Sequence, residues 1–208
     1  MENLTLIIPA KYESESLPEV LGELKKFNYN ICVVLKDTDL ETINSIKNFN
    51  VKIIYQKGQG YGNALIEGIN FCKTKYFCIF NADGSFDPNE IQGMMNRLKS
   101  NNNDFIFASR YEKNAGSEDD TFVTLVGNYI FSSIGKIFFN LGISDILYTF
   151  VIGDTLKSKE LNLQSNDFRF CVELPIKAKK NNFNLGVFPS YERKRIAGKK
   201  KVNAFKDG

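Results

Sequence analysis

The residues best suited to chemistry lie in a short acidic segment, residues 81–88 (NADGSFDP), which follows an apolar run over residues 76–80. Asp83 and Asp87 therefore stand just beyond the end of a predicted strand, where a dissolved ligand can reach them. Carboxylate oxygens suit Mg²⁺ or Mn²⁺, and such ions usually bridge to substrate phosphates. We expect Asp83 to be a metal ligand. Asp87 has a structural alternative, as the N-cap of a helix with Pro88 at its first position.

Histidine is absent from the 208 residues, and this excludes several kinds of mechanism. Neither a Ser/His/Asp nor a Cys/His arrangement can operate. A bound metal must use carboxylates, amides or thiolates. A proton must pass through Asp, Glu, Lys, Tyr or water. The four cysteines form no C-x-x-C pair, and three lie in apolar runs, so we expect buried free thiols.

Three glycines follow the third predicted strand, at positions 58, 60 and 62. They give G-x-G-x-G, but Asn63 stands where a dinucleotide-binding fingerprint would need its last glycine, and that fingerprint belongs after a first strand. The spacing instead indicates a loop whose backbone closely approaches a ligand or a helix.

Repeated strand–helix units must position these residues. Continuous apolar runs predict strands over residues 4–9, 31–35, 51–55, 76–80 and 105–108, and helical spacing predicts helices over residues 14–27, 40–49 and 88–98, with another that ends near Cys72. This order implies a mostly parallel sheet covered on both faces, with ligands beyond the carboxyl ends of its strands. The length and the lack of linkers predict one domain, residues 1–190. A basic tail, residues 191–208, is expected to complete the site or to contact the membrane surface.

Two further segments bear on partners. Residues 122–143 carry Lys136 as their only charge, with apolar residues at helical spacing, so the helix either packs on the sheet or lies at a membrane surface. The basic tail either meets phosphates or is simply solvated. Without a signal-peptide pattern at the N-terminus, we expect a cytoplasmic protein, peripheral at the inner membrane face if the helix meets lipid. Nucleic-acid binding is not expected, because the basic residues gather in one tail without interleaved aromatics.

Seven segments in order resemble family 2 glycosyltransferases, and within them the dolichyl-phosphate mannose synthase-like enzymes. The segments are IIPAKYESESLP, GYGNALIEGI, FNADGSFDP, SRY, ISDILYTF, FRFCVELPIKA and RIAGKKKV. The resemblance implies an α/β, Rossmann-like GT-A fold with a mostly parallel central sheet flanked by helices. It also implies transfer of a sugar, with inversion, from a nucleotide-sugar donor, assisted by Mg²⁺ or Mn²⁺.

The resemblance assigns roles to residues of this chain. Asp83 and Asn81 would hold the metal, and Arg110, Arg195 and Lys201 would bind phosphate oxygens. The residues implied in nucleotide binding are Pro9, Ala10, Glu13, Asp37, Gly60, Asn63, Asn81 and Ala82. Those implied in catalysis are Arg110, Asp145, Glu173 and Arg195, with Asp145 and Glu173 as the candidate bases for a hydroxyl acceptor.

Structural alternatives accompany several of these roles. Arg110 could be an ion-pair partner, Asp145 could cap a turn, and Glu173 could be exposed to solvent. Residues 199–201 could contact an anionic surface. The sequence leaves open a UDP- or GDP-linked donor and a polyprenyl-phosphate or glycan acceptor. A non-catalytic partner subunit and a nucleotidyltransferase are the alternative functions.

Overall fold

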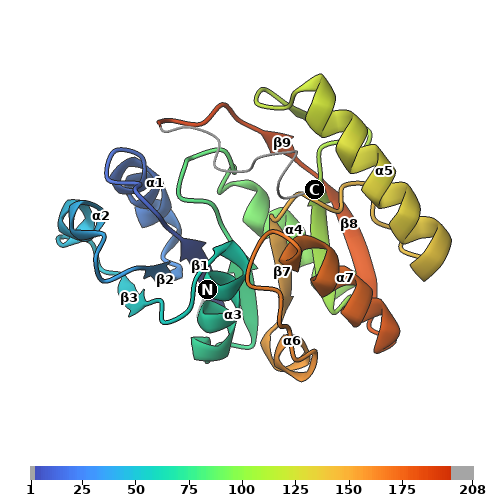
Figure 1. The fold of residues 1–208 in the computed structure, drawn as a ribbon, viewed down its shortest axis with the longest axis horizontal. Helices are drawn as coiled ribbons and strands as arrows, with labels where there is room; N and C mark the ends of the chain where they lie inside the picture. Colours follow the sequence, from blue (N-terminus) through green and yellow to red (C-terminus); the bar gives the residue numbers. More distant parts are fainter. Residues whose placement is uncertain (1–2, 198–208) are drawn as a thin grey trace.

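The computed structural model describes residues 3–197, and its centre is a seven-stranded sheet (Figure 1). The strand order is β3-β2-β1-β4-β7-β5-β8, and β7 is antiparallel to both neighbours. The bounds are β1 Leu4–Pro9, β2 Asn30–Leu35, β3 Lys52–Tyr55, β4 Tyr76–Ile79, β5 Phe105–Ser109, β7 Val151–Asp154 and β8 Leu185–Pro189. The expected mostly parallel sheet and its first five strands are confirmed, whereas β7 and β8 were not predicted.

Helices cover both faces of the sheet. Side chains of α1 (Leu17–Leu24), α2 (Leu40–Ile46) and α4 (Glu90–Ser100) pack in one apolar core, and those of α3 (Tyr61–Phe71) and α7 (Phe170–Lys180) pack in the other. The short helices are η1 (Lys25–Phe27), which continues α1, and α6 (Thr155–Glu160), which contacts α3. Because both faces are buried, successive residues of β1 point into opposite cores: Leu6 and Ile8 into the first, Ile7 into the second.

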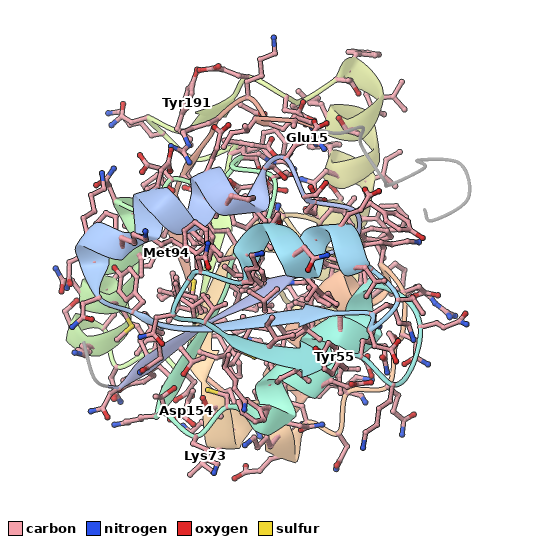
Figure 2. The ribbon with its side chains drawn as sticks, turned by 90° about the vertical axis from the view of Figure 1, so that its left-hand side faces the viewer. Glu15, Tyr55, Lys73, Met94, Asp154 and Tyr191 are labelled. Carbon is pink, nitrogen blue, oxygen red and sulfur yellow. The ribbon has the colours of Figure 1, made fainter. Side chains whose placement is uncertain are left out.

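The carboxyl ends of the parallel strands lie together at one end of the molecule. In Figure 2, Glu15, which follows β1, and Tyr191, which follows β8, lie at the top. Lys73, which precedes β4, and Asp154, the last residue of antiparallel β7, lie at the bottom. The loops that follow β1 and β8 therefore lie at the upper end, whereas Tyr55, the last residue of the edge strand β3, lies lower in the same view. Open α/β sheets bind ligands beyond the carboxyl ends of their strands.

The helix predicted over residues 122–143 is α5 (Phe122–Phe139). Unlike an ordinary surface helix, it buries polar and small residues and exposes apolar ones. Its buried residues are Asn128, Ser132 and Gly135, whereas Val123, Val126, Ile130, Ile134 and Ile137 are exposed. The expectation that its apolar face packs on the sheet is therefore wrong. The polar side chains face inward because Asn128 and Ser132 hydrogen-bond to main-chain groups of residues 144–147.

The chain crosses the upper end of the sheet again after β8, through a second, two-stranded sheet (Figure 1). This sheet pairs β6 (Gly116–Ser117) with β9 (Tyr191–Glu192) in parallel. Residues 191–197 pack against the domain, because β9 pairs with β6 and the amides of Arg193 and Ile196 donate to the carbonyl oxygens of Ser85 and Asp83. The rest of the predicted basic tail, including Lys201, lies outside the described residues.

Candidate active site

A cleft of about 1500 Å³ opens at the carboxyl ends of the strands. Most of the predicted site residues line it: Pro9, Ala10, Glu13, Gly60, Asn81, Ala82, Asp83, Arg110, Glu173 and Arg195. Aromatic side chains, among them Tyr61, Phe86 and Tyr148, form much of the remaining wall. Asp37, Asn63 and Asp145 are not among the lining residues.

The loop after β4 presents Asp83 in a fixed orientation. Its Oδ1 accepts hydrogen bonds from the amide (3.0 Å) and hydroxyl (2.7 Å) of Ser85, and Asn81 Nδ2 donates to the same hydroxyl oxygen at 3.4 Å. The turn needs Gly84, whose φ of +82° favours glycine. Asp83 Oδ2 and Asn81 Oδ1 remain as the oxygens that a cation would use.

This donor set fits a magnesium or manganese ion that shares its coordination with a substrate. Within residues 3–197, no three acidic or thiol side chains gather in a way that could hold a metal alone. Mg²⁺ is usually held by one or two carboxylates together with waters and substrate phosphates. One carboxylate and one amide therefore suffice only when a phosphate group completes the shell.

Arg195 brings a positive charge directly to Asp83. Its Nη1 lies 3.5 Å from Asp83 Oδ2, and its Nη2 donates to Asp119 Oδ2 at 2.7 Å. Burial alone would lower the pKa of Arg195, but the hydrogen bond to Asp119 and the charge of Asp83 raise it overall. The guanidinium is thus a permanent charge in the cleft wall.

Arg110, directly after β5, is enclosed by acidic groups. Its Nε and Nη2 donate to the two carboxylate oxygens of Asp145 at 2.7 and 3.0 Å, and its amide donates at 3.1 Å. Asp145 is fully buried, so neither oxygen faces an acceptor. This geometry matches the ion-pair alternative for Arg110 and gives Asp145 no access to an acceptor proton. Burial opposes the charge of Arg110, yet Asp145 and Glu192 together raise its pKa.

Glu192, on β9, is a cleft residue that sequence analysis missed. It is buried, it lines the cleft, and its Oε2 accepts from Arg110 Nη1 at 3.0 Å and from the Ser117 hydroxyl. The sequence offers one weak signal, an acidic residue directly before a run of basic ones. Its contact with Arg110 spans 82 positions and depends on the pairing of β6 with β9.

Glu173, on α7, lines the cleft but is committed to a neighbouring loop. Its carboxylate accepts from the amides of Gln164 and Ser165 and pairs with Lys177 at 2.7 Å. Burial would raise the pKa of Glu173, but these partners lower it overall. A carboxylate with a lowered pKa is a weaker base than an ordinary one, so its position supports the loop better than it supports proton removal.

The glycine loop closes on protein backbone. A Cβ at Gly60 would lie 2.1 Å from the Asn166 carbonyl oxygen, and one at Gly62 would lie 2.1 Å from that of Ser165. Asn63 donates its amide to the same Asn166 oxygen at 3.0 Å. The expected close approach is therefore to residues 165–167, and Glu67 occupies the loop amides of Lys57 and Gly58.

The loop after β2 differs from the prediction. Asp37 is exposed and lies outside the cleft lining. Asp39 is buried instead: it caps α2 through the amide of Thr42 and accepts from the amide of Tyr12 at 2.7 Å. Lys36 donates to the carbonyl oxygens of Gln56 and Gly58, so it ties the β3 loop to β2. Asp39 and Lys36 therefore shape the edge of the cleft.

Comparison with known proteins gives a family and a fold. The family model of glycosyl transferase family 2 matches residues 5–156. An uncharacterized glycosyltransferase of Rickettsia prowazekii is 34% identical over 116 residues, which cover 52% of this chain and 36% of that protein. One from Mycobacterium bovis is 26% identical over 95 residues, covering 46% and 43%. These matches span less than half the length of either relative.

Solved structures resemble the whole described chain. The UDP complex of glucosyl-3-phosphoglycerate synthase from Mycobacterium tuberculosis superposes with a TM-score of 0.74 at 11% identity, covering 97% of this chain and 74% of that one. Mannosyl-3-phosphoglycerate synthase from Rubrobacter xylanophilus gives a TM-score of 0.73 at 13% identity, covering 93% and 67%. At such identities the likeness establishes the fold, which is GT-A.

Proposed function

The chain belongs to glycosyl transferase family 2, and from that membership we propose that it is a metal-dependent, inverting enzyme that transfers a sugar from a UDP- or GDP-linked donor. The observation that carries the proposal is the convergence of Asn81, Asp83 and Arg195 in one cleft at the carboxyl ends of the strands. Oxygen ligands and a guanidinium side by side suit a nucleoside diphosphate. Complexes of glucosyl-3-phosphoglycerate synthase with UDP and either Mn²⁺ or Mg²⁺ are consistent with this donor class.

The position of each residue in the cleft indicates its role. Asp83 and Asn81 would hold Mg²⁺ or Mn²⁺, which supplies Lewis-acid stabilisation of the charge that develops on the departing diphosphate. Arg195 binds phosphate oxygens of the donor. Asp145 holds the Arg110 guanidinium, and Arg110 in turn hydrogen-bonds to Glu192. Arg110 is therefore a positioning residue. An ionised phosphate acceptor needs no base, whereas a hydroxyl acceptor would pass its proton to a carboxylate such as Glu192.

Calorimetric titration of UDP and of GDP, with and without Mn²⁺, tests the donor site. We expect one nucleotide to bind when Mn²⁺ is present and the binding to disappear in Asp83→Ala. The matched control is Asp87→Ala, in the same loop, because the Asp87 carboxylate holds only Asn89 ahead of α4. Binding of neither nucleotide to folded protein would refute the donor site and favour the partner-subunit alternative. Release of pyrophosphate from a nucleoside triphosphate would favour a nucleotidyltransferase.

For the acceptor, we propose a polyprenyl phosphate presented at the inner face of a membrane. The support is α5, the helix within residues 3–197 that is long and apolar enough to cross a membrane by length and composition, with 17% of it buried. Five large side chains are exposed on this helix: Phe122, Tyr129, Ile130, Ile137 and Phe138. A contiguous exposed apolar face is typical of a surface that contacts a partner or a membrane. Val123, Gly127 and Phe131 on the same helix line the cleft, so this face adjoins the site.

Charge favours a bilayer as the occupant of that face. Lys136 lies on α5, and Lys180, in the last turn of the neighbouring α7, places its ammonium 5.4 Å from the centre of the Phe139 ring. Lys179 lies in the same turn of α7, whereas the ammonium of Lys177 in that turn is paired with Glu173. Basic residues beside an apolar helix face are the combination that binds anionic lipid surfaces.

Flotation with vesicles that contain anionic phospholipid tests the acceptor surface. We expect the wild-type chain to float with the vesicles and the double variant Ile130→Gln/Ile137→Gln to stay in solution. The control is Leu156→Gln, because Leu156 is 70% exposed on α6, away from this face. Loss of dimers rather than of vesicle binding in the double variant would refute the proposal and identify the face as a subunit interface.

A further inference from the structure

The guanidinium of Arg195 lies next to Asp83 Oδ2, the carboxylate oxygen that a metal ion would bind. Asp83 has two oxygens, and Oδ1 is taken by the amide and hydroxyl of Ser85. Oδ2 faces Arg195 Nη1 at 3.5 Å. A guanidinium and a divalent cation cannot share this oxygen without repulsion, because the interior screens like charges weakly.

Arg195 is held in this position from two sides. Asp119, between β6 and α5, accepts from Nη2 at 2.7 Å. The main chain around Arg195 is also fixed to the metal loop, since the amide of Arg193 donates to the Ser85 carbonyl and that of Ile196 to the Asp83 carbonyl, both at 2.8 Å. The side chains of Asp83, Asp119 and Arg195 are each 16–20% exposed, so solvent screens the group only partly.

We propose that Arg195 is the resident counter-ion of Asp83 in the ligand-free protein and exchanges partners when the donor binds. In the complex, the Asp83 carboxylate binds the cation in place of the guanidinium, and the Arg195 guanidinium binds the diphosphate of the donor. The inference deepens the proposed function and rests on it, because it takes Asp83 to be the metal ligand.

The exchange makes metal and nucleotide binding depend on each other. Without nucleotide, the cation must displace Arg195 with nothing to receive the guanidinium, so its affinity is low. With nucleotide present, the diphosphate receives the guanidinium and contributes ligands to the cation. By linkage, each ligand strengthens the other by the same factor. The arrangement predicts that the donor and its cation bind as a pair.

The electron paramagnetic resonance signal of free Mn²⁺ measures metal binding directly, with no reliance on activity. Mn²⁺ is titrated into the wild-type chain, Arg195→Gln and the control Lys194→Gln, each without and with UDP or GDP, whichever nucleotide the wild type binds. Lys194 is a matched control because it is the neighbouring cation and its side chain is exposed, whereas Arg193 donates to the Phe86 carbonyl in the loop that carries Asp83. Asp83→Asn, which lacks the carboxylate, gives the signal of free Mn²⁺ expected when the site does not bind the metal.

Removal of the guanidinium should raise the affinity for Mn²⁺ and lower the affinity for the nucleotide. Without nucleotide, we expect Arg195→Gln to bind Mn²⁺ at least about fivefold more tightly than wild type, the low end of typical coupling. With Mn²⁺ present, the same variant should bind the nucleotide at least about fivefold more weakly. Lys194→Gln should match wild type in both. Arg195→Lys, which keeps the charge, should keep the weak nucleotide-free binding of Mn²⁺.

The outcomes separate this inference from the proposed function. Equal or weaker nucleotide-free Mn²⁺ binding by Arg195→Gln overturns the counter-ion role, whereas nucleotide-dependent Mn²⁺ binding by the wild type would still stand as support for the donor site. A wild-type chain that binds no Mn²⁺ even with UDP or GDP overturns both. A purely structural role for Arg195 would weaken both ligands together, so the opposite signs distinguish exchange from loss of folding.

Discussion

Arg110 and Asp145 form an ion pair from which water is excluded, and such pairs are costly to break from one side. Asp145→Asn leaves the buried guanidinium with Glu192 as its remaining close carboxylate, and breaking one buried ion pair typically costs about 3 kcal/mol of folding free energy. Urea unfolding monitored by circular dichroism measures the loss. Asp37→Asn, at an exposed aspartate, should change stability by less than about 0.5 kcal/mol. Equal stability of the two variants would contradict the structural role of Asp145.

The lowered pKa of Glu173 makes its contribution to stability depend on pH. Because the folded state holds this carboxylate charged, its contribution is complete above the ordinary pKa of glutamate and is lost as pH falls through the lowered pKa. Glu173→Gln should therefore be less stable than wild type at pH 7, and the difference should shrink below about pH 4. Urea unfolding at pH 7, 5, 4 and 3 measures the difference. A difference that is constant over this range would show that the charge is irrelevant.

Residue identity alone predicted the place of Asp83 in the cleft but not the other charged residues that surround it. Asp83 could be found because its position depends on local sequence, a carboxylate directly after an apolar strand. Glu192, Asp119 and the partner of Arg110 could not, because each contact joins residues more than 30 positions apart. No local pattern encodes which distant carboxylate will meet a given arginine.

At the scale of elements, β1, β2, β4 and β5 were predictable because most of their residues are buried on both faces, and the edge strand β3 was predictable from its apolar run although none of its residues is fully buried. Their runs are continuously apolar, whereas β7 contains Gly153 and β8 is only partly buried along its length. Helix α5 was predicted from its spacing, but its inverted orientation was not. The orientation depends on main-chain groups of residues 144–147, which Asn128 and Ser132 bind.

The packing of α3 against residues 165–167 gives a prediction at the same scale. Gly62→Ala places a methyl group 2.1 Å from the Ser165 carbonyl oxygen and 2.6 Å from that of Asp167, so the loop must shift. Overpacking of this kind typically costs about 1–3 kcal/mol. Gly22→Ala is the matched control, because no atom lies within 4 Å of its added methyl group and alanine favours α1 by about 0.5–1 kcal/mol. Opposite shifts in the urea midpoint are expected, and a neutral Gly62→Ala would contradict the close approach.

At the scale of the whole molecule, the cleft joins segments that are far apart in the chain. Glu13, Asp83, Arg110, Glu173 and Arg195 come from five separate stretches. A ligand that binds in this cleft stabilises the folded chain as a unit rather than one loop, since the unfolded chain offers it no assembled site.

Thermal unfolding with donor nucleotide and Mn²⁺ together should therefore show a large shift. At a hundredfold excess over the dissociation constant, binding adds about 2.7 kcal/mol, which raises the melting temperature of a chain this size by about 5–11 °C. Mn²⁺ alone should give a much smaller rise, because Arg195 already neutralises Asp83. Asp83→Ala should lose the joint shift, whereas Gly22→Ala should keep it from a higher starting point. Two separate shifts that simply add would show that the ligands bind independently, and the exchange of Asp83 between arginine and cation would then not occur.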